Sequence, residues 1–426
     1  MNTNKATLTE KLSDIQIDSC PNADNLNICL CDDFIPIIRF AHEHQDCDPV
    51  RLLFQQQRYP DTDMRLVAQQ LEGQRQSSAK WPTLAQCADI FYPPKLNREQ
   101  SSSEATARYK AHIFSHLGGG TFADLTGGMG IDTLFLATAA THGDYVEQDE
   151  DLGRIARHNF AAIGQHNLHC HQCDSMEWIG AQTTAHYDLL YIDPARRDSQ
   201  GRKVAAFEDC TPNLLDNLAS LLGRCRHLMV KASPMIDIDT ALTQLKTAEE
   251  VHIVAVGGEC KEVLFILSGN DTTASPVFHC LDLTAIPSPI TFTRPEEAAA
   301  QPRFADSIGK YLYEPNAALM KGGCHNSVCQ WYDMAKLARN THLYTTDQWV
   351  ADFPGRKFEI IQELTLNAKA IAKILPEHKA HVATRNYPMA AAELQKKLKL
   401  HEGGAHFIIA ATLASRPIGL LCRQRY

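Results

Sequence analysis

Between Thr121 and Leu267 the chain alternates short apolar runs with segments of helical spacing. Such alternation is typical of a mostly parallel sheet whose strands are joined by crossover helices. Only residues 257–262 separate the last two apolar runs, too few for a crossover helix, and this predicts an antiparallel pair at one edge of the sheet. Seven strands are expected in one α/β domain, at residues 122–125, 144–147, 169–173, 189–192, 227–231, 252–256 and 263–267.

A glycine-rich turn follows the first predicted strand. Asp124 stands at the end of that strand, Gly127, Gly128 and Gly130 come next, and the following segment has helical spacing. A strand, a glycine turn and a helix in this order place a ligand at the carboxyl ends of the strands. A dinucleotide fingerprint starting at Gly128 would need glycine where the chain has Thr133. The spacing therefore disfavours NAD or a flavin without excluding them.

Acidic residues follow the next predicted strands at the same edge. Glu147 ends the second strand, where a carboxylate can accept hydrogen bonds from both hydroxyls of a ribose. Asp174 follows the third strand and would either receive the exocyclic amine of adenine or cap the next helix. Asp193 and Pro194 end the fourth strand, where they would position a nucleophile. Asp124 would accept from an amino group, which predicts a ligand that is cationic at its reactive end.

These motifs carry a resemblance to a known family. Residues 105–268 resemble the class I S-adenosylmethionine-dependent methyltransferases, which implies a Rossmann-like seven-stranded sheet and S-adenosyl-L-methionine as cofactor. The motifs are Asp-Leu-Thr-Gly-Gly-Met-Gly at 124–130, Val-Glu at 146–147, Ala-Arg-His-Asn at 156–159, Cys-Asp at 173–174 and Asp-Pro-Ala-Arg at 193–196.

The resemblance also implies roles for single residues. The methionine end of the cofactor would lie on the glycine turn, the ribose on Glu147 and the adenine on Asp174. The methyl acceptor would face the end of the fourth strand. The implied cofactor-binding residues are Asp124, Gly127, Gly128, Gly130, Glu147 and Asp174, and the implied catalytic residues are Asp193 and Pro194.

The last motif departs from two related groups. Base-amino methyltransferases place an aromatic residue where Arg196 stands, so stacking on a flipped base is not implied. Uracil C5 RNA methyltransferases pair the motif with a nucleophilic cysteine after the fifth strand, whereas residues 230–235 contain none. Direct in-line transfer positioned by Asp193 is therefore expected. Arg196 and Lys231 would contact a substrate phosphate or form salt bridges inside the domain.

The regions before and after the sheet suggest further domains. Residues 1–95 have helical spacing and predict a helical N-terminal domain, and residues 96–272 would form the methyltransferase domain. Residues 273–320 predict a linker or a small α+β unit. At the first boundary, Ser101-Ser-Ser-Glu104 predicts a capping box in which Ser101 caps the next helix and Glu104 bonds back to its amide.

The C-terminal region, residues 321–426, is predicted to be a small α+β domain of opposite charge. It holds 15 Lys and Arg against 8 Asp and Glu, whereas residues 1–320 hold 26 against 42. Such an asymmetry is compatible with a polyanionic partner and equally with a solvated face.

The same region resembles the THUMP-like domain attached to a group of bacterial methyltransferases. The resemblance rests on residues 376–388, on a basic segment at 391–400 and on the apolar run Phe-Ile-Ile-Ala at 407–410. THUMP domains belong to RNA-modifying enzymes, so the resemblance implies tRNA or rRNA as partner, with Arg385, Lys396 and Lys397 on the phosphates. A solvated amphipathic helix explains the two lysines equally well.

Composition bounds the remaining possibilities. No apolar run approaches the roughly 20 residues of a membrane span, and the N-terminus has no signal-peptide segment, so a cytoplasmic location without membrane contact is expected. The 14 cysteines are scattered and predict free thiols. The cluster His169-Cys170-His171-Gln-Cys173 lacks a second cysteine pair and predicts a strand with alternating faces, and no metal site is expected.

Three functions are compatible with these features. The first is an RNA methyltransferase whose basic domain presents a nucleotide to Asp193. The second is a methyltransferase of protein or small molecules whose C-terminal domain serves oligomerisation. The third is a binding module that keeps the cofactor fold without turnover.

Overall fold

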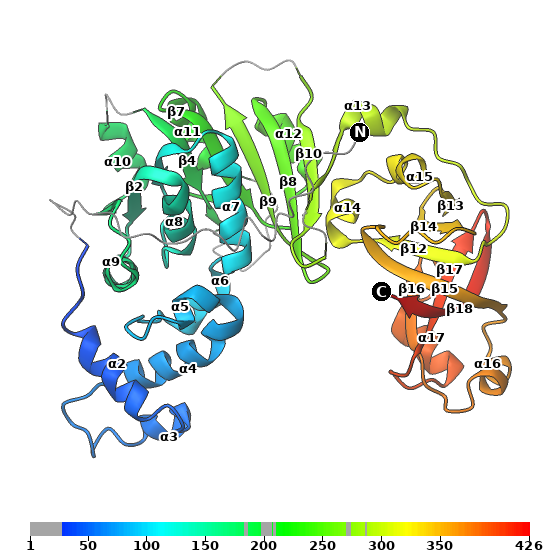
Figure 1. Cartoon of the computed structure of the whole chain (residues 1–426), viewed down its shortest axis with the longest axis horizontal. Helices are drawn as coiled ribbons and strands as arrows, with labels where there is room; N and C mark the ends of the chain where they lie inside the picture. The colour runs from blue at the N-terminus through cyan, green and yellow to red at the C-terminus, as the bar shows by residue number, and fades with distance from the viewer. Residues whose placement is uncertain (1–27, 183–185, 197–206, 208–209, 270–273, 286–287) are drawn as a thin grey trace. The chain divides into compact units, whose positions relative to one another are not determined.

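The computed structural model describes residues 28–182, 186–196, 207, 210–269, 274–285 and 288–426. These residues fall into two compact units (Figure 1). The first unit holds residues 28–250 and 263–269, and the second unit holds residues 251–262 and 274–426. Arg196 is described by its backbone alone.

The first unit begins with helices, as predicted. In α2 the apolar residues recur at helical spacing, so that Phe34, Ile37 and Ile38 face a shared core. Val67 and Leu71 of α4 complete this core. Aspartates cap α3 and α4 through their side chains. The helices are α2 (Phe34–Glu43), α3 (Pro49–Leu53), α4 (Met64–Lys80), α5 (Pro82–Ala85) and α6 (Lys95–Gln100).

Two buried side chains of α9 (Glu150–Ile163) tie these helices to the sheet domain. The Asn159 amide accepts from Phe91 N and donates to Phe91 O, both at 2.9 Å. The His158 ring accepts at Nδ1 from Cys31 N at 3.0 Å and donates from Nε2 to Asp89 O at 2.7 Å. This pair of bonds requires the neutral ring, and burial lowers the pKa of His158 accordingly.

A nine-stranded sheet contains all seven predicted strands, whose observed ends differ from the predicted ones by up to four residues. β1 pairs in parallel with β2 and β4, β2 with β3, and β4 with β7, while β7 and β9 are antiparallel. The order is β11-β10-β8-β9-β7-β4-β1-β2-β3. The bounds are β1 (Gly120–Asp124), β2 (Ala140–Glu147), β3 (Leu168–Gln172), β4 (Tyr187–Ile192), β7 (Cys225–Ala232), β8 (Ala248–Val256), β9 (Glu259–Ser268), β10 (Val277–Asp282) and β11 (Ile290–Thr293).

The hairpin of β8 and β9 was predicted at the edge of the sheet, and this placement is wrong. The two strands are neighbours and are joined by Gly257 and Gly258, both with positive φ, as a tight hairpin turn requires. However, β10 and β11 extend the sheet beyond β8. These two strands are short and lie in the proline-containing segment 273–320, so their pattern did not distinguish strands from a linker.

Helices cross between the parallel strands (Figure 1). The helix predicted after the glycine turn is short, since α8 gives way to a 3₁₀ turn at Ala137–Ala139 and β2 begins at Ala140. A two-stranded ribbon of β5 (Ala195–Arg196) and β6 (Cys210–Thr211) follows β4. The helices are α7 (Glu104–His116), α8 (Ile131–Leu136), α9, α10 (Ser175–Ala181), α11 (Leu214–Leu222) and α12 (Ile238–Gln244).

The second unit contains a seven-stranded sheet in the order β13-β14-β12-β15-β18-β17-β16. Both faces of β17 are buried, since Ile409 and Ala411 join one core while Ile408 and Ala410 join the other. This explains the unbroken apolar run of that strand. The strands are β12 (Tyr311–Pro315), β13 (Ala335–Ala338), β14 (Thr341–Thr346), β15 (Gly355–Leu364), β16 (His381–Arg385), β17 (His406–Leu413) and β18 (Arg416–Arg425).

In the described part of the second unit five helices accompany the sheet, and the predicted basic helix is among them as α17. Leu394 and Leu398 of α17 pack with Ile371 of α16 against the sheet. The helices are α13 (Arg294–Ala299), α14 (Ala317–Gly322), α15 (Ser327–Trp331), α16 (Ala368–Ile374) and α17 (Ala391–Leu398). Among the described residues, no helix of either unit combines the length and apolarity of a membrane span.

Candidate active site

A cavity of about 300 Å³ opens at the carboxyl ends of β1, β2, β3 and β4 in the first unit. This is where open α/β sheets bind ligands. The rest of the wall is formed by Ser101 and Ser102, between α6 and α7, and by Thr211 and Pro212 at the end of β6. Its lining includes Gln100, Ser101, Ser102, Asp124, Gly127, Gly128, Gly130, Asp132, Glu147, Asp174, Asp193 and Thr211.

Two of the three predicted glycines are required by aromatic rings that lie beneath the turn. A Cβ on Gly127 would lie 2.2 Å from Cε2 of Tyr145, and one on Gly130 would lie 2.6 Å from Cζ of Phe160. Gly128 and Gly130 also have φ values of +52° and +81°, which favour glycine. The Tyr145 hydroxyl donates to Gly128 O at 2.6 Å and holds the turn on β2. The turn therefore lies close to the sheet and keeps its backbone open to the cavity.

Asp124 lies beneath this turn and is almost fully buried. Its Oδ1 accepts from Thr126 N at 3.0 Å and its Oδ2 from the Thr133 hydroxyl at 2.6 Å. Burial raises the pKa of Asp124 to about 7, although these two hydrogen bonds partly oppose the shift. Thr133, which broke the dinucleotide glycine pattern, thus supports the carboxylate of Asp124.

Glu147 and Asp174 lie on the cavity wall, where the sequence placed them. Glu147 accepts from Gly128 N at 2.7 Å through Oε2 and from Asp149 N at 2.9 Å through Oε1. Asp174 caps α10 through Oδ1, which accepts from Met176 N at 2.8 Å and Glu177 N at 3.0 Å. A carboxylate has about four lone-pair positions, so both residues can still accept from a ligand. For Asp174, the capping alternative and the cavity position are both realised.

Asp193 lies at the lip of the cavity and is paired with Lys231 of β7. Its Oδ2 binds Lys231 Nζ, and its backbone N donates to the Thr126 hydroxyl at 2.7 Å. Lys231 is largely buried, so the intramolecular ion pair that the sequence left open is formed. Pro194 is buried behind the lip. Arg196 lies in β5, two residues beyond Pro194, and its side chain lies outside the described residues.

A buried ion pair beside the cavity was missed by the sequence analysis. Lys110 of α7 is inaccessible to solvent, and its Nζ lies 3.1 Å from Asp132 Oδ1. Asp132 also accepts from the hydroxyls of Ser102 at 2.7 Å and Tyr191 at 2.8 Å. Burial would raise the pKa of Asp132, but Lys110 and Lys231 reverse this and leave it below its ordinary value. The available signal was a lysine on the face of α7 that carries Ala107 and Phe114.

The capping box predicted at the start of α7 is wrong. Ser103 caps the helix by accepting from Thr106 N, while Ser101 ends α6 and lines the cavity. Glu104 turns instead to Thr83, whose N and hydroxyl donate to it at 2.8 and 2.6 Å. The tertiary contact displaces the local one because Glu104 is buried. The segment that holds Ser101 can therefore face the cavity.

The charge of the cavity limits its ligands. Its lining contains five carboxylates, on Asp124, Asp132, Glu147, Asp174 and Asp193, and no lysine or arginine among the residues that the structure describes. Asp132 and Asp193 are paired with Lys110 and Lys231, so the acidity of the wall comes mainly from Asp124, Glu147 and Asp174, and such a wall disfavours a pyrophosphate and favours a cation. The donor and acceptor set therefore fits a ligand with an ammonium or sulfonium charge and polar hydroxyls, and fits NAD or a flavin poorly.

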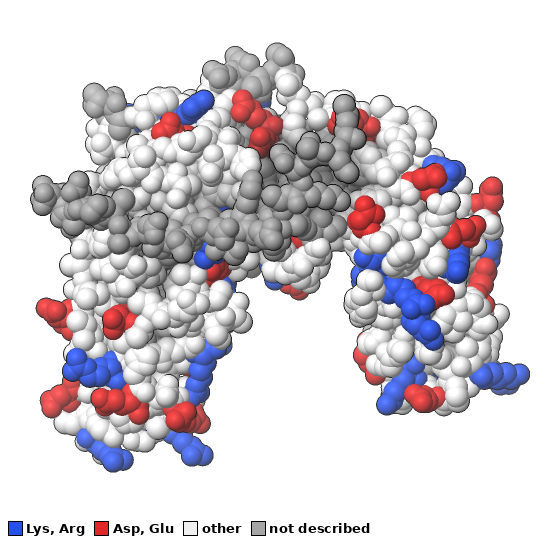
Figure 2. Space-filling view, in the orientation of Figure 1, with Lys and Arg blue, Asp and Glu red and all other residues white. Residues whose placement is uncertain are grey.

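The predicted RNA-contacting residues belong to the second unit. Arg385 binds Glu314, which also accepts from Arg356 Nε at 2.7 Å, so Arg385 is engaged within the domain. Lys396 and Lys397 are exposed on α17. Figure 2 shows Lys and Arg side chains side by side on the visible face of this unit, with acidic side chains among them.

Known proteins resemble this chain over most of its length. Residues 311–354 match a ferredoxin-like domain family, and residues 355–424 match a THUMP domain-like family. The crystal structure of a candidate methyltransferase from Porphyromonas gingivalis W83 is similar over 93% of this chain and 100% of its own, with 32% identity and a TM-score of 0.83. No curated protein matches the chain.

More distant structures share smaller parts of the chain. An O-methyltransferase from Bacillus cereus in complex with SAH covers 46% of this chain and 97% of its own, with 11% identity and a TM-score of 0.33. TrmK from M. capricolum in complex with S-adenosyl-homocysteine covers 39% and 68%, with 9% identity and a TM-score of 0.30.

Proposed function

Because the chain belongs to the class I S-adenosylmethionine-dependent methyltransferases that carry a C-terminal THUMP-like domain, we propose that it methylates a nucleotide of tRNA or rRNA by direct in-line transfer. The observation that carries the proposal is the carboxylate-lined cavity whose lip is formed by Asp193. S-adenosylmethionine, when bound there, supplies an electrophilic methyl group on a sulfonium.

Different residues of the cavity would bind different parts of the cofactor. Asp124 and the glycine turn would hold the methionine end, Glu147 the ribose hydroxyls and Asp174 the adenine amine. Asp132 adds a second carboxylate close to the methionine end, which the sequence did not suggest.

Asp193 would orient the acceptor and accept its proton. The carboxylate is fixed on one side by Lys231 and by the backbone bond to Thr126, so only its remaining lone pairs face the cavity. Holding an attacking atom in line with the methyl group is the main contribution that an enzyme makes to such a transfer. A carboxylate that takes up the departing proton adds to it.

Glu147→Ala tests the placement of the ribose. We expect its Kd for S-adenosylmethionine, measured by titration calorimetry, to rise at least about 30-fold, because two charge-assisted hydrogen bonds are removed. The matched control is Glu150→Ala, which removes an exposed carboxylate three residues further along the chain. Equal affinities of the two variants would count against the cofactor site.

The pKa of Asp124 predicts how cofactor affinity depends on pH. Because burial raises this pKa to about 7, lowering the pH through 7 protonates the carboxyl and removes its charge from the ammonium of the ligand. We expect the Kd for S-adenosylmethionine to be about fivefold higher at pH 6 than at pH 7. Asp124→Asn should bind weakly at both pH values, and a pH dependence that persists in this variant would assign the effect to another group.

The same pKa has a consequence for stability in the absence of ligand. The folded pKa of Asp124 exceeds its ordinary value of 3.8, so the folded protein binds this proton more tightly than the unfolded chain does. Its contribution to stability is therefore fully present below about pH 4 and is lost as the pH rises through about 7.

RNA is proposed as the acceptor on two grounds, the THUMP-like match and the positive charge of residues 321–426. Transfer of tritiated methyl groups into total RNA from a deletion strain tests it directly. Label in an RNA fraction supports the proposal. Label in protein or small metabolites would replace it with the alternative, in which the C-terminal domain serves oligomerisation.

The double variant Lys396→Glu, Lys397→Glu tests the role of α17. We expect weaker RNA binding and a plot of log K against log salt that is shallower by about 2, one unit for each lysine that no longer neutralises a phosphate. Lys369→Glu, Lys373→Glu is the matched control, because it changes the net charge equally on exposed positions of α16. If both double variants weakened RNA binding equally, the loss would reflect net charge alone and would count against a specific role of α17.

A further inference from the structure

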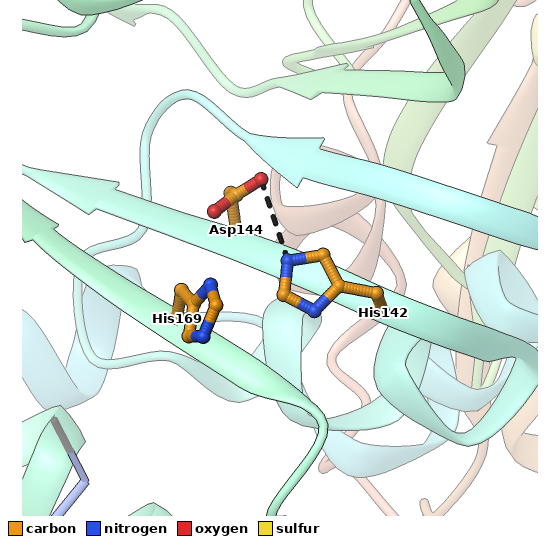
Figure 3. A group of neighbouring side chains, drawn as sticks. All are labelled: His142, Asp144 and His169. Carbon is orange, nitrogen blue, oxygen red and sulfur yellow. Dashed lines mark ion pairs between the residues drawn. The ribbon is translucent and has the colours of Figure 1, made fainter. Parts of the chain in front are cut away.

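Three side chains of the kind that bind metal ions meet on β2 and β3. His142 and Asp144 are two residues apart on β2, so their side chains point to the same face of the sheet. His169 of β3 is paired with Asp144 in the parallel register. One nitrogen or oxygen of each lies within 4.8 Å of the others. Figure 3 shows the His169 ring beside the pair formed by Asp144 and His142.

Asp144 is held in place by groups outside this trio. Its Oδ1 bonds the His171 Nε2 at 2.7 Å, and its Oδ2 accepts from the Tyr187 hydroxyl at 2.8 Å. The ring of Trp178 lies against both partners, at centroid distances of 4.7 Å from His171 and 6.3 Å from Tyr187. Of the roughly four lone-pair positions of the carboxylate, about two remain. Such outer partners are what orient the carboxylate of a metal site.

The spacing of His142 and Asp144 is closer to that of two metal ligands than to that of a hydrogen bond. The His142 Nε2 lies 3.7 Å from Asp144 Oδ2, and the rings of His142 and His169 have centroids 4.6 Å apart. Two ligands of a tetrahedral ion at roughly 2.0–2.1 Å lie about 3.4 Å from each other. His142 is about one-third exposed, with 35% of its side chain accessible, so an ion can enter from solvent.

We propose that His142, Asp144 and His169 bind one divalent transition-metal ion, with water at the fourth position. Two imidazoles and a carboxylate match zinc best. The expectation of no metal site came from the consecutive cluster at 169–173, in which Cys170 is buried on the opposite face of β3 from His169. The ligands that His169 needs come from β2 instead.

The site would act on stability. β3 is the last strand of the sheet, and an ion shared with β2 would fasten it. Asp144, the proposed ligand nearest to the cavity, lies three residues before Glu147 on β2, which corresponds to about 10 Å along the strand. The ion is therefore too far from the cofactor cavity to contact the reacting atoms.

Cobalt titration of the metal-free full-length protein tests the proposal. We expect one equivalent of Co²⁺ to give the visible bands of a tetrahedral nitrogen and oxygen site, without the near-ultraviolet band that a thiolate adds. One equivalent of Zn²⁺ should raise Tm by about 4 °C. His169→Ala and His142→Ala should each lose both effects. His142 is the more informative position because its partial exposure makes misfolding of the variant a minor concern.

A second pair of histidines provides the control. His112 and His116 lie one turn apart on α7 with ring centroids 4.0 Å apart, a spacing that can bind metal weakly. His112→Ala should keep the cobalt spectrum and the zinc-induced rise in Tm. Loss of both effects in this variant, or their retention in His142→Ala and His169→Ala, would overturn the proposal. A thiolate band at one equivalent would overturn it as well.

Discussion

Asp193→Asn is expected to lower kcat for methyl transfer at least about 100-fold, because the variant loses the charge that orients the acceptor and receives its proton. The Kd for S-adenosylmethionine should change by less than about threefold, since Asp193 stands at the lip of the cavity and the Glu147 and Asp174 carboxylates remain. Single-turnover transfer from tritiated cofactor measures kcat, and calorimetry measures Kd.

Lys231 provides the control for this variant. Removing the charge of Asp193 leaves the cation of Lys231 at the lip beside a neutral group, which by itself could disturb the site. The double variant Asp193→Asn, Lys231→Met removes both charges. It should fold like the wild type and stay as inactive as the single variant. Recovery of kcat in the double variant would show that the ion pair, and not the carboxylate, accounts for the loss.

Lys110→Met is expected to destabilise the first unit by about 3 kcal/mol at pH 7, because it leaves the buried carboxylate of Asp132 without its nearest cation. Urea unfolding followed by circular dichroism measures the destabilisation. The bonds from Ser102 and Tyr191 remain, so the expected effect lies at the lower end for a broken buried ion pair.

The pH dependence of this effect follows from the lowered pKa of Asp132. In the wild type the carboxylate contributes stability that is present above its unfolded pKa and is lost as the pH falls through the folded one. In Lys110→Met the pKa should rise, so the carboxyl protonates at mildly acid pH and the difference from the wild type shrinks. Lys110→Met, Asp132→Asn should recover most of the stability. Equal destabilisation of both variants would attribute it to packing of the lysine stem.

The position of the candidate site could be predicted because parallel strands end at a common edge. Asp124 and Glu147 end strands and Asp174 and Asp193 follow strands, and strand order alone brings all four to one cavity. The alternation of short strand-like runs with helical segments was sufficient to locate all seven strands, although β3 at the edge of the sheet is only partly buried.

The features that were missed depend on partners distant in sequence. Lys110 is recognisable as a site residue only once Asp132 is seen beside it. Glu104 follows the capping pattern, but burial against Thr83 outweighs a local bond to the helix start. The strands β10 and β11 are short and become recognisable only by pairing onto β8. In each case the local sequence does not show which distant residue or strand is the partner.

The bonds that His158 and Asn159 make to backbone atoms of the N-terminal region, before α2 and between α5 and α6, bear on how this protein could have been assembled. A chain that began at residue 96 would leave the Asn159 amide without Phe91 and the His158 ring without Cys31 and Asp89. The motif at 156–159 thus also binds the N-terminal region. If recombination replaced that region alone, the new segment would have to form the same bonds to α9. The N-terminal region and α9 are therefore expected to be inherited together.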